Sequence, residues 1–197
     1  SLPTEASLKE TIRSENKLLA LLTFVFFAHV MDFVIMMPLG DVLMKELNIT
    51  AREFSALIYI YSIMAFVMGI ISATLTDRFD RRPALMITLT GFPIGALLCG
   101  LAENYFFLFL ARGFTGAFGG VTGGIIFAII SDVVPFERRG RALGILTGSF
   151  SLASIIGIPF SLWMAGKLDW HAPFIFFAMV SAIAWIAAWK MVPELRG

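Results

Sequence analysis

Six apolar stretches, each long enough to cross the hydrocarbon core of a bilayer, constrain this chain more than any other feature. A transmembrane helix needs about 20 mostly apolar residues. Only two of the stretches hold a charged residue, and none alternates as the strands of a membrane barrel do. The pattern therefore predicts an all-α membrane protein, a bundle of six transmembrane helices. The stretches cover residues 18–39, 54–75, 84–102, 105–131, 142–166 and 172–189.

Composition excludes most soluble classes of protein. Hydrophobic residues make up 58% of the 197 residues and charged residues only 15%, whereas soluble domains carry about 25% charge. The net charge of +1 is too small for a nucleic-acid partner. The single cysteine excludes an internal disulfide and a cysteine-rich metal site. We expect no metal, no cofactor and no enzyme activity, because the spans also lack the side-chain pairs of an intramembrane enzyme.

The distribution of Lys and Arg predicts the orientation. Eleven of the 15 basic residues lie on the side that holds the N-terminus, and three lie in the loops of the other side. Basic loops stay in the cytoplasm, so we expect both termini to be cytoplasmic. We divide the chain into a cytoplasmic segment 1–17, a transmembrane domain 18–192 and a cytoplasmic tail 193–197. The capping-box spacing of Ser7 and Glu10 predicts a short surface helix over about residues 5–17.

Two charged residues lie inside spans, where an ionisable group is a functional candidate by default. Asp32 lies seven residues before Leu39, and Arg112 lies seven residues after Tyr105, so both sit about 10 Å below the outer boundary at 1.5 Å per residue. We expect an ion pair, which either fixes packing or responds to protons and substrate. His29 lies on the same helix face as Asp32 and either shares its proton or packs as an ordinary core residue.

Small residues gather in the fourth and fifth spans. Lipid offers no hydrophobic drive for helix association, so close backbone approach through small residues holds such helices together. We expect these positions to serve packing, and also the sliding or rocking of helices. They are Gly116, Gly120, Gly124, Gly148, Gly157 and Pro159.

Several local motifs resemble those of the major facilitator superfamily. The turn at residues 73–85 is similar to the family signature Gly-x-Leu-Ala-Asp-Arg-x-Gly-Arg-Arg/Lys-x-x-Leu, although Ala73 and Asp80 stand where the family prefers glycine. Arg112, Thr115 and Gly116 resemble the Arg-x-x-Gln-Gly motif with Thr for Gln. The loop 132–144 and the end of the fifth span are also typical. The turn matches the signature at Leu75, Asp77, Arg78, Arg81, Arg82 and Leu85.

The resemblance covers residues 18–192 and is to the N-terminal six-helix half of the fold, most like the drug and sugar efflux proton antiporters. It implies secondary active export of a small organic molecule by alternating access, with protons as the coupling ion, in a bacterial inner membrane. The second six-helix half is then either an absent C-terminal half or a second copy in a parallel homodimer. The alternative is a non-transporting structural or regulatory membrane module, or an inactive excised half.

The resemblance also implies roles for the charged residues. Asp32 is expected to be the proton-responsive group, and Arg112 to hold an anionic part of the cargo when Asp32 is protonated. The cytoplasmic loops are expected to form a gate in which Asp77 caps a helix of the second half and latches the outward-facing state. The positive-inside rule explains the arginines of this gate but not its aspartates. The gate residues are Asp77, Arg78, Arg81, Arg82, Asp132 and Arg139.

Overall fold

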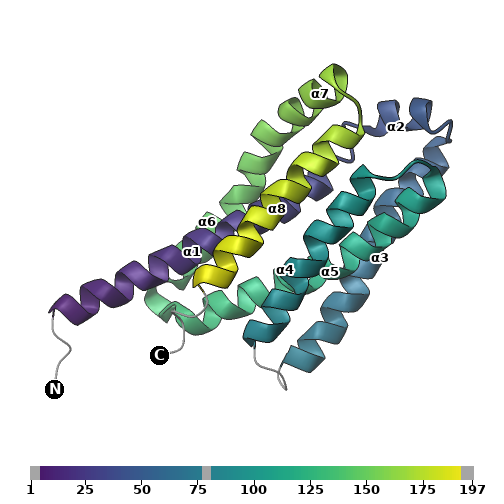
Figure 1. Ribbon diagram of the computed structural model, residues 1–197. Helices are drawn as coiled ribbons and strands as arrows, with labels where there is room; N and C mark the ends of the chain where they lie inside the picture. Colours follow the sequence, from purple (N-terminus) through teal and green to yellow (C-terminus); the bar gives the residue numbers. More distant parts are fainter. Residues whose placement is uncertain (1–4, 77–80, 192–197) are drawn as a thin grey trace.

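The computed structural model describes residues 5–76 and 81–191, which fold into helices with no strand among them (Figure 1). Six of its helical segments are long and apolar enough to span a membrane, which confirms the all-α fold class and the expected number of spans. The fifth span is built from three consecutive pieces, α6, η1 and α7. The elements are α1 (Glu5–Val34), α2 (Gly40–Glu46), α3 (Ala51–Thr76), α4 (Arg81–Gly100), α5 (Tyr105–Val133), α6 (Phe136–Leu152), η1 (Ala153–Gly157), α7 (Ile158–Lys167) and α8 (His171–Met191).

Polar caps mark where three of the helices begin. Thr50 and Glu53 form a reciprocal capping box at the start of α3, with the Thr50 N–H donating to Glu53 Oε2 at 2.8 Å. The Asn104 side chain accepts the Phe107 N–H at the start of α5. Asp169 accepts backbone N–H groups before α8. These caps satisfy donors that the first turn of a helix leaves without a partner.

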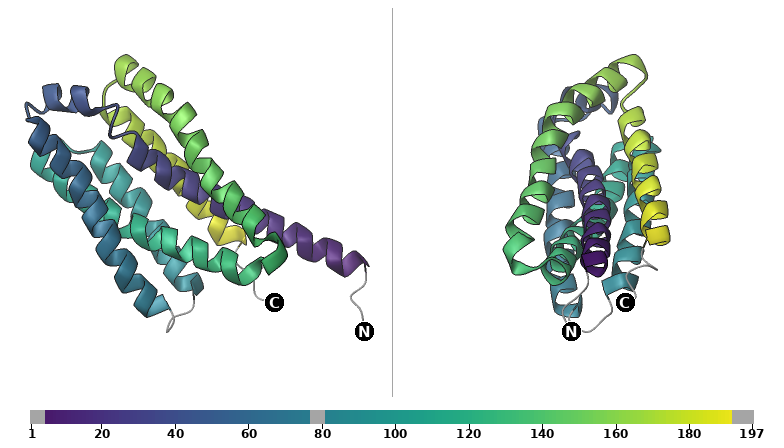
Figure 2. Two further views of the ribbon diagram at one scale, coloured as in Figure 1. Left: turned by 180° about the vertical axis from the view of Figure 1, so that it is seen from behind. Right: turned by 90° about the vertical axis from the view of Figure 1, so that its left-hand side faces the viewer.

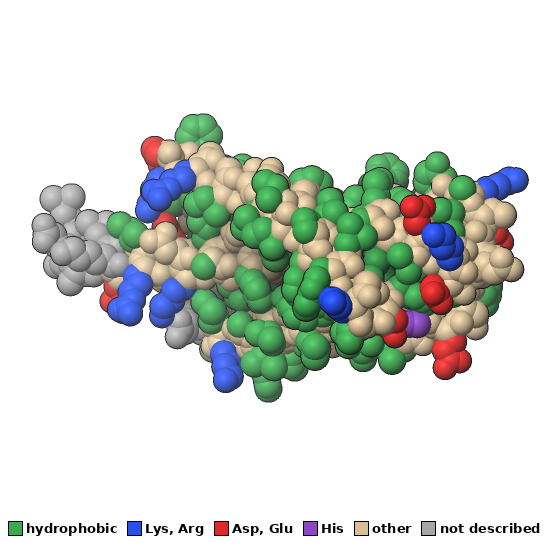
Figure 3. All heavy atoms as spheres, turned by 90° about the horizontal axis from the view of Figure 1, so that it is seen from above, with side chains coloured by type: hydrophobic (Ala, Val, Ile, Leu, Met, Phe, Trp, Pro, Cys, Tyr) green, Lys and Arg blue, Asp and Glu red, His purple; other side chains and the backbone are tan. Residues whose placement is uncertain are grey.

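The helices form one elongated bundle. The closest packing joins α3 to α5 and α4 to both α5 and α8, while α1 packs against α6, η1 and α8 (Figure 2). The beginning of α1 and the end of α8 lie toward the same end of the bundle (Figure 1). The cytoplasmic location of both termini stays a prediction, because the arrangement of the helices alone does not tell which end of the bundle faces the cytoplasm. Hydrophobic side chains cover much of the middle of the face in Figure 3, with most charges toward its two ends.

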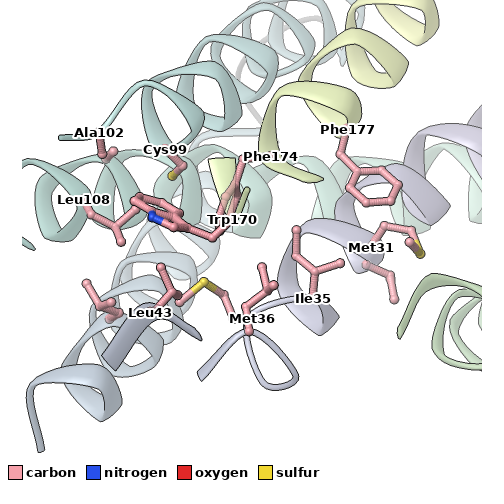
Figure 4. Packing of buried hydrophobic residues seen from close by; sticks show 14 of the residues in the cluster. Met31, Ile35, Met36, Leu43, Cys99, Ala102, Leu108, Trp170, Phe174 and Phe177 are labelled. Carbon is pink, nitrogen blue, oxygen red and sulfur yellow. The ribbon is translucent and has the colours of Figure 1, made fainter. Parts of the chain in front are cut away.

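Two buried cores fill the bundle. One contains Leu22, Leu89, Ile126 and Leu146. The other lies at the α2 end and includes Leu108 and the aromatic pair Trp170 and Phe174 (Figure 4). The second core matters for function, because the charged residues of the fourth and first spans are buried beside it.

The structure corrects the expected start of the chain. No separate surface helix covers residues 5–17, since α1 runs without interruption from Glu5 to Val34. Ser7 lies inside this helix and is not its cap. Residues 5–17 contain three Glu and two Lys, and neither Gly nor Pro lies between Glu5 and Val34, so nothing there stops a helix.

The end of the first span is also corrected. α1 ends at Val34 and not at Leu39, residues 35–39 form turns, and the short helix α2 follows. Pro38 explains the end, because its ring fixes φ, removes an N–H and disfavours helical geometry at the residue before it. We call residues 35–46 the cap. Figure 4 shows Ile35, Met36 and Leu43 of the cap converging on the same core as Trp170.

Candidate functional site

Asp32 and Arg112 form a fully buried ion pair between α1 and α5. Arg112 Nη1 donates to Asp32 Oδ2 at 2.8 Å, and both side chains have 0% exposure. The two residues are 80 positions apart in the sequence, so only the fold brings them together. The pair lies inside the six-helix unit, with no second half needed to bury it.

Residues of the cap lie in the apolar core next to the pair. Ile35, Leu39 and Leu43 have 0% exposure and belong to the same core as Leu108 and Ala111, which precede Arg112 on α5. Because α1 ends two residues after Asp32, the depth counted from Leu39 is wrong. Asp32 is nevertheless fully buried.

Tyr61 of α3 covers one face of the guanidinium. Arg112 Cζ lies 4.4 Å from the centroid of the Tyr61 ring, a cation–π geometry, and Tyr61 also packs against Phe33 of α1. Two glycines of α5 leave the space that Tyr61 occupies. A Cβ at Gly116 would overlap the Tyr61 backbone, and one at Gly119 would lie 2.7 Å from the Tyr61 hydroxyl oxygen.

Sequence reasoning missed Tyr61, although a signal was present. A tyrosine in the middle of an apolar span carries a polar group that lipid cannot satisfy. Tyr61 turns inward and is 7% exposed, whereas Tyr59 of the same helix is 64% exposed, so the residue type alone gives only a weak signal.

Several polar atoms of the ion pair have no partner. Asp32 Oδ1 and the Nε and Nη2 atoms of Arg112 are buried and make no hydrogen bond to any described residue. Buried polar groups are nearly always hydrogen-bonded. The Cys99 thiol lies beside the guanidinium and 3.6 Å from Thr115 Oγ1, but a thiol is a weak acceptor. The pair therefore keeps unused hydrogen-bonding capacity.

His29 has a separate environment one turn before Asp32. Its Nδ1–H donates to the Val25 carbonyl at 2.8 Å, and its ring stacks on Phe92 of α4 with centroids 3.6 Å apart. Its Nε2 is buried and finds no acceptor or donor in the described chain. No hydrogen bond between His29 and Asp32 is found among the described residues, so the predicted sharing of a proton is not seen in this conformation.

The predicted cytoplasmic gate falls largely on residues beyond this description. Asp77 and Arg78 lie outside the described residues, and so do the side chains of Arg81 and Arg82. Asp132 is exposed in the last turn of α5. Whether Asp132 meets Asp77 and Arg81 thus stays a prediction.

Arg139 holds the turn that follows α5. Its Nη2 donates to the Ser131 carbonyl and, at 3.5 Å, to the Val134 carbonyl. A cation at the C-terminal end of a helix is favourable because its last carbonyls lack helical partners. Beside it, Arg138 pairs with Glu15 of α1 at 3.2 Å, which ties α6 to α1.

The small residues divide into two groups. Gly116 and Gly120 lie against α3 so closely that a Cβ would overlap the backbone of Tyr61 or Ala65. At Gly124 and Gly148 no described atom lies within 4 Å of a Cβ. The expected packing contact is therefore not seen at Gly124 and Gly148 among the described residues, and the role of these two glycines stays a prediction.

Gly157 and Pro159 belong to an irregular turn in the fifth span. Residues Ala153–Gly157 form a π-helix immediately before the turn that holds Pro159. Proline cannot donate to the carbonyl four residues earlier, and a wider turn accommodates that loss. A Cβ at Gly157 would overlap the Met31 side chain, so this turn presses against the residue next to Asp32. π-turns of this kind are frequent at functional sites.

A family model described as Major Facilitator Superfamily matches residues 22–196. An uncharacterised MFS-type transporter of Bacillus subtilis, YwfA, is 34% identical over 158 residues, which are 80% of this chain and 38% of that protein. The class H tetracycline resistance protein of Pasteurella multocida is 29% identical over 174 residues, covering 85% of this chain and 42% of that protein. The chain thus spans about two fifths of the length of the relatives it matches.

Solved structures show the same fold at low sequence identity. A bacterial homologue of the human lysosomal transporter Spinster, in an inward-facing and unoccupied conformation, superposes with a TM-score of 0.76 at 17% identity, over 93% of this chain and 43% of that chain. A peptide transporter crystallised with sulfate has a TM-score of 0.76 at 19% identity, over 87% of this chain and 37% of that chain.

Proposed function

Because the chain belongs to the Major Facilitator Superfamily, we propose that it forms half of a proton-coupled exporter of small organic molecules. The whole transporter then contains a second six-helix half, supplied by a C-terminal half or by a second copy of this chain. We propose a bacterial inner membrane as its location, since the relatives named above are bacterial. The relatives named for tetracycline resistance support export of an organic cargo.

The buried Asp32–Arg112 pair carries this proposal. Removing two charges from water costs more than their attraction returns in many proteins, so a buried ion pair is weak evidence for stability. An ionisable pair inside a membrane span is by default a functional candidate. The pair therefore suits a task that needs a change of charge.

Alternating access supplies such a task. When Asp32 is ionised, Arg112 is paired with it at 2.8 Å. When a proton binds Asp32, the carboxylate loses its charge and the guanidinium loses its counter-ion. Protonation of Asp32 thus changes the charge that this site presents to cargo, and this change would couple cargo binding to proton binding. His29, one turn away, is a secondary candidate on the proton path.

The uncovered faces support a second half. A Cβ at Gly124 of α5 or at Gly148 of α6 would meet no described atom within 4 Å. The exposed Thr147 and Ser151 on α6 are polar for a surface that meets lipid. We propose that the second half covers them. The latch formed by Asp77 and its neighbours is part of the same proposal.

The experiment reconstitutes the complete transporter that contains this chain into vesicles. We expect Asp32→Asn to abolish cargo accumulation driven by an imposed pH gradient and to leave cargo exchange without a gradient in place. Glu103→Gln, the same loss of a carboxylate charge at an exposed position between α4 and α5, is the matched control and should behave as wild type.

Three outcomes decide the proposal. Loss of gradient-driven uptake with retained exchange supports Asp32 as the proton-responsive group. If the Asp32→Asn variant accumulates cargo under a pH gradient as the wild type does, Asp32 is not the proton-responsive group. A wild-type assembly that exchanges no cargo at all would favour a non-transporting module.

A further inference from the structure

His171, the first residue of α8, bridges two chain connections at the α2 end of the bundle. Its Nε2 lies 2.9 Å from the carbonyl oxygen of Ala102, which stands 69 positions earlier between α4 and α5. Its Nδ1 lies 3.5 Å from Oδ1 of Asp169, between α7 and α8. The side chain is 31% exposed, so protons from solution reach it. We call these two contacts the His171 clip.

The geometry of the clip suits only one protonation state of the imidazole. Both atoms that the ring contacts are oxygens that accept hydrogen bonds, and a neutral imidazole carries a single N–H. With the proton on Nε2, the lone pair of Nδ1 faces the Asp169 carboxylate. With the proton on Nδ1, the lone pair of Nε2 faces the Ala102 carbonyl. Only the imidazolium presents an N–H to both oxygens, and its charge also attracts the carboxylate.

Two neighbours hold the clip in place. The Trp170 ring stacks on the imidazole with centroids 3.7 Å apart and is itself buried against Phe174. Asp169 Oδ1 also accepts the backbone N–H groups of His171 and Ala172, which fixes the carboxylate. The indole face adds a further preference for the charged ring, because aromatic faces attract cations.

Few other charges surround the imidazole. Among the described residues, the carboxylate within 4 Å of the ring belongs to Asp169. Glu103 follows Ala102, and Lys167 ends α7; both are exposed charges, which water and salt screen. α8 itself carries no charged residue between His171 and Lys190. The charge of His171 therefore acts mainly on Asp169.

The clip lies over the core at the α2 end. Ala102 and Trp170 both belong to this core, together with Ile35 and Leu43 of the cap (Figure 4). A contact between the α4–α5 connection and the α7–α8 connection thus joins two sides of the same core. Loss of that contact frees the two connections to separate.

We propose that the His171 clip is a proton-sensitive closure of the α2 end: a proton on His171 joins the two connections over the core, and its loss releases them. Histidine changes charge between about pH 5 and 8. The clip is therefore complete at the acid end of this range and is lost as the pH rises through it. The inference goes beyond the proposed function, because it depends on neither cargo nor Asp32.

The test measures the distance between two spin labels by electron paramagnetic resonance, in the complete transporter in detergent. The labels are attached at Glu103→Cys and Lys167→Cys, with Cys99→Ala and every other cysteine replaced. Both labelled positions are exposed, and one lies on each connection. We expect one short distance at about pH 5 and a shift to longer, broader distances at about pH 8, because the neutral ring no longer joins the connections.

Two variants assign the shift to the clip. His171→Gln keeps a donor for Ala102 but cannot gain a charge, so its distances should be the same at both pH values. Asp169→Asn still caps α8 and offers an amide N–H to Nδ1 of the neutral ring, so the short distance should persist at both. Glu137→Gln, an exposed change at the other end of the bundle, is the control and should keep the wild-type shift.

Two results would overturn the inference. One is a wild-type distance that does not change between the two pH values. The other is a pH-dependent shift that persists in His171→Gln or Asp169→Asn, with circular dichroism showing that the variant is folded. Because neither cargo nor a gradient is present, these results leave the role of Asp32 to the transport experiment above.

Discussion

At the scale of single residues, the charge pair depends on neighbours that carry no charge. Tyr61 shields the guanidinium, Gly116 and Gly119 make room for Tyr61, and Met31 beside Asp32 contacts Gly157. These contacts surround Arg112 where its Nη1 reaches Asp32. A change at an uncharged residue should therefore alter the pair.

Tyr61 tests this dependence. Tyr61→Phe keeps the ring over the guanidinium, whereas Tyr61→Leu keeps apolar bulk and removes the π face. A desolvated cation–π contact contributes about 2 kcal/mol, so we expect Tyr61→Leu to lower the free energy of unfolding by about that amount more than Tyr61→Phe does. Denaturant titration in detergent, followed by circular dichroism, measures the difference. Equal losses in the two variants would show that Tyr61 acts only through packing volume.

At the scale of elements, α3 and α5 are joined by backbone contact. Gly120 lies directly on the Ala65 backbone, while Gly124, one turn later, meets no described atom within 4 Å. The same helix thus contains one glycine that is packed and one that is not. Each is preceded by a glycine and followed by a β-branched residue, so the two positions form a matched pair for mutation.

We expect Gly120→Ala to separate α3 from α5 and to destabilise the bundle by about 1–3 kcal/mol, the usual cost of overpacking. Gly124→Ala should be neutral in the isolated chain or stabilising by roughly 0.5–1 kcal/mol, because alanine favours helix over glycine. Unfolding of the purified chain in detergent measures both. Similar losses at the two positions would contradict the packing described here.

Element boundaries also show what the sequence could predict. The six spans follow from apolar length, and the Asp32–Arg112 pair follows from two isolated opposite charges within spans, although the depth counted for Asp32 is wrong. Span length alone, however, could not reveal the cap, because residues 35–39 are as apolar as a helix and only Pro38 marks the turn. The π-turn at Ala153–Gly157 and the position of Tyr61 against the α5 glycines depend on which helices pack against each other. A single sequence does not specify this packing.

At the scale of the whole molecule, an even number of spans predicts that the two described ends of the chain lie on one side of the membrane. The end of the bundle that holds α2 carries Glu103, and the opposite end carries Glu137 at the start of α6. The excess of Lys and Arg predicts that the Glu137 end faces the cytoplasm. The same orientation decides from which side a proton reaches Asp32 past the cap.

The orientation is tested with two single-cysteine variants, Glu103→Cys and Glu137→Cys, in a Cys99→Ala background. Both glutamates are exposed, so neither change should disturb packing, and Cys99 is buried in the wild type. In intact cells, a membrane-impermeant maleimide should label the Glu103→Cys variant and should label the Glu137→Cys variant only after the cells are opened. Labelling of both variants from outside would contradict the six-span topology. The reverse pattern would keep the bundle but invert it, and the cap would then close the cytoplasmic end, so that Asp32 would take its proton from the cytoplasm when the cap opens.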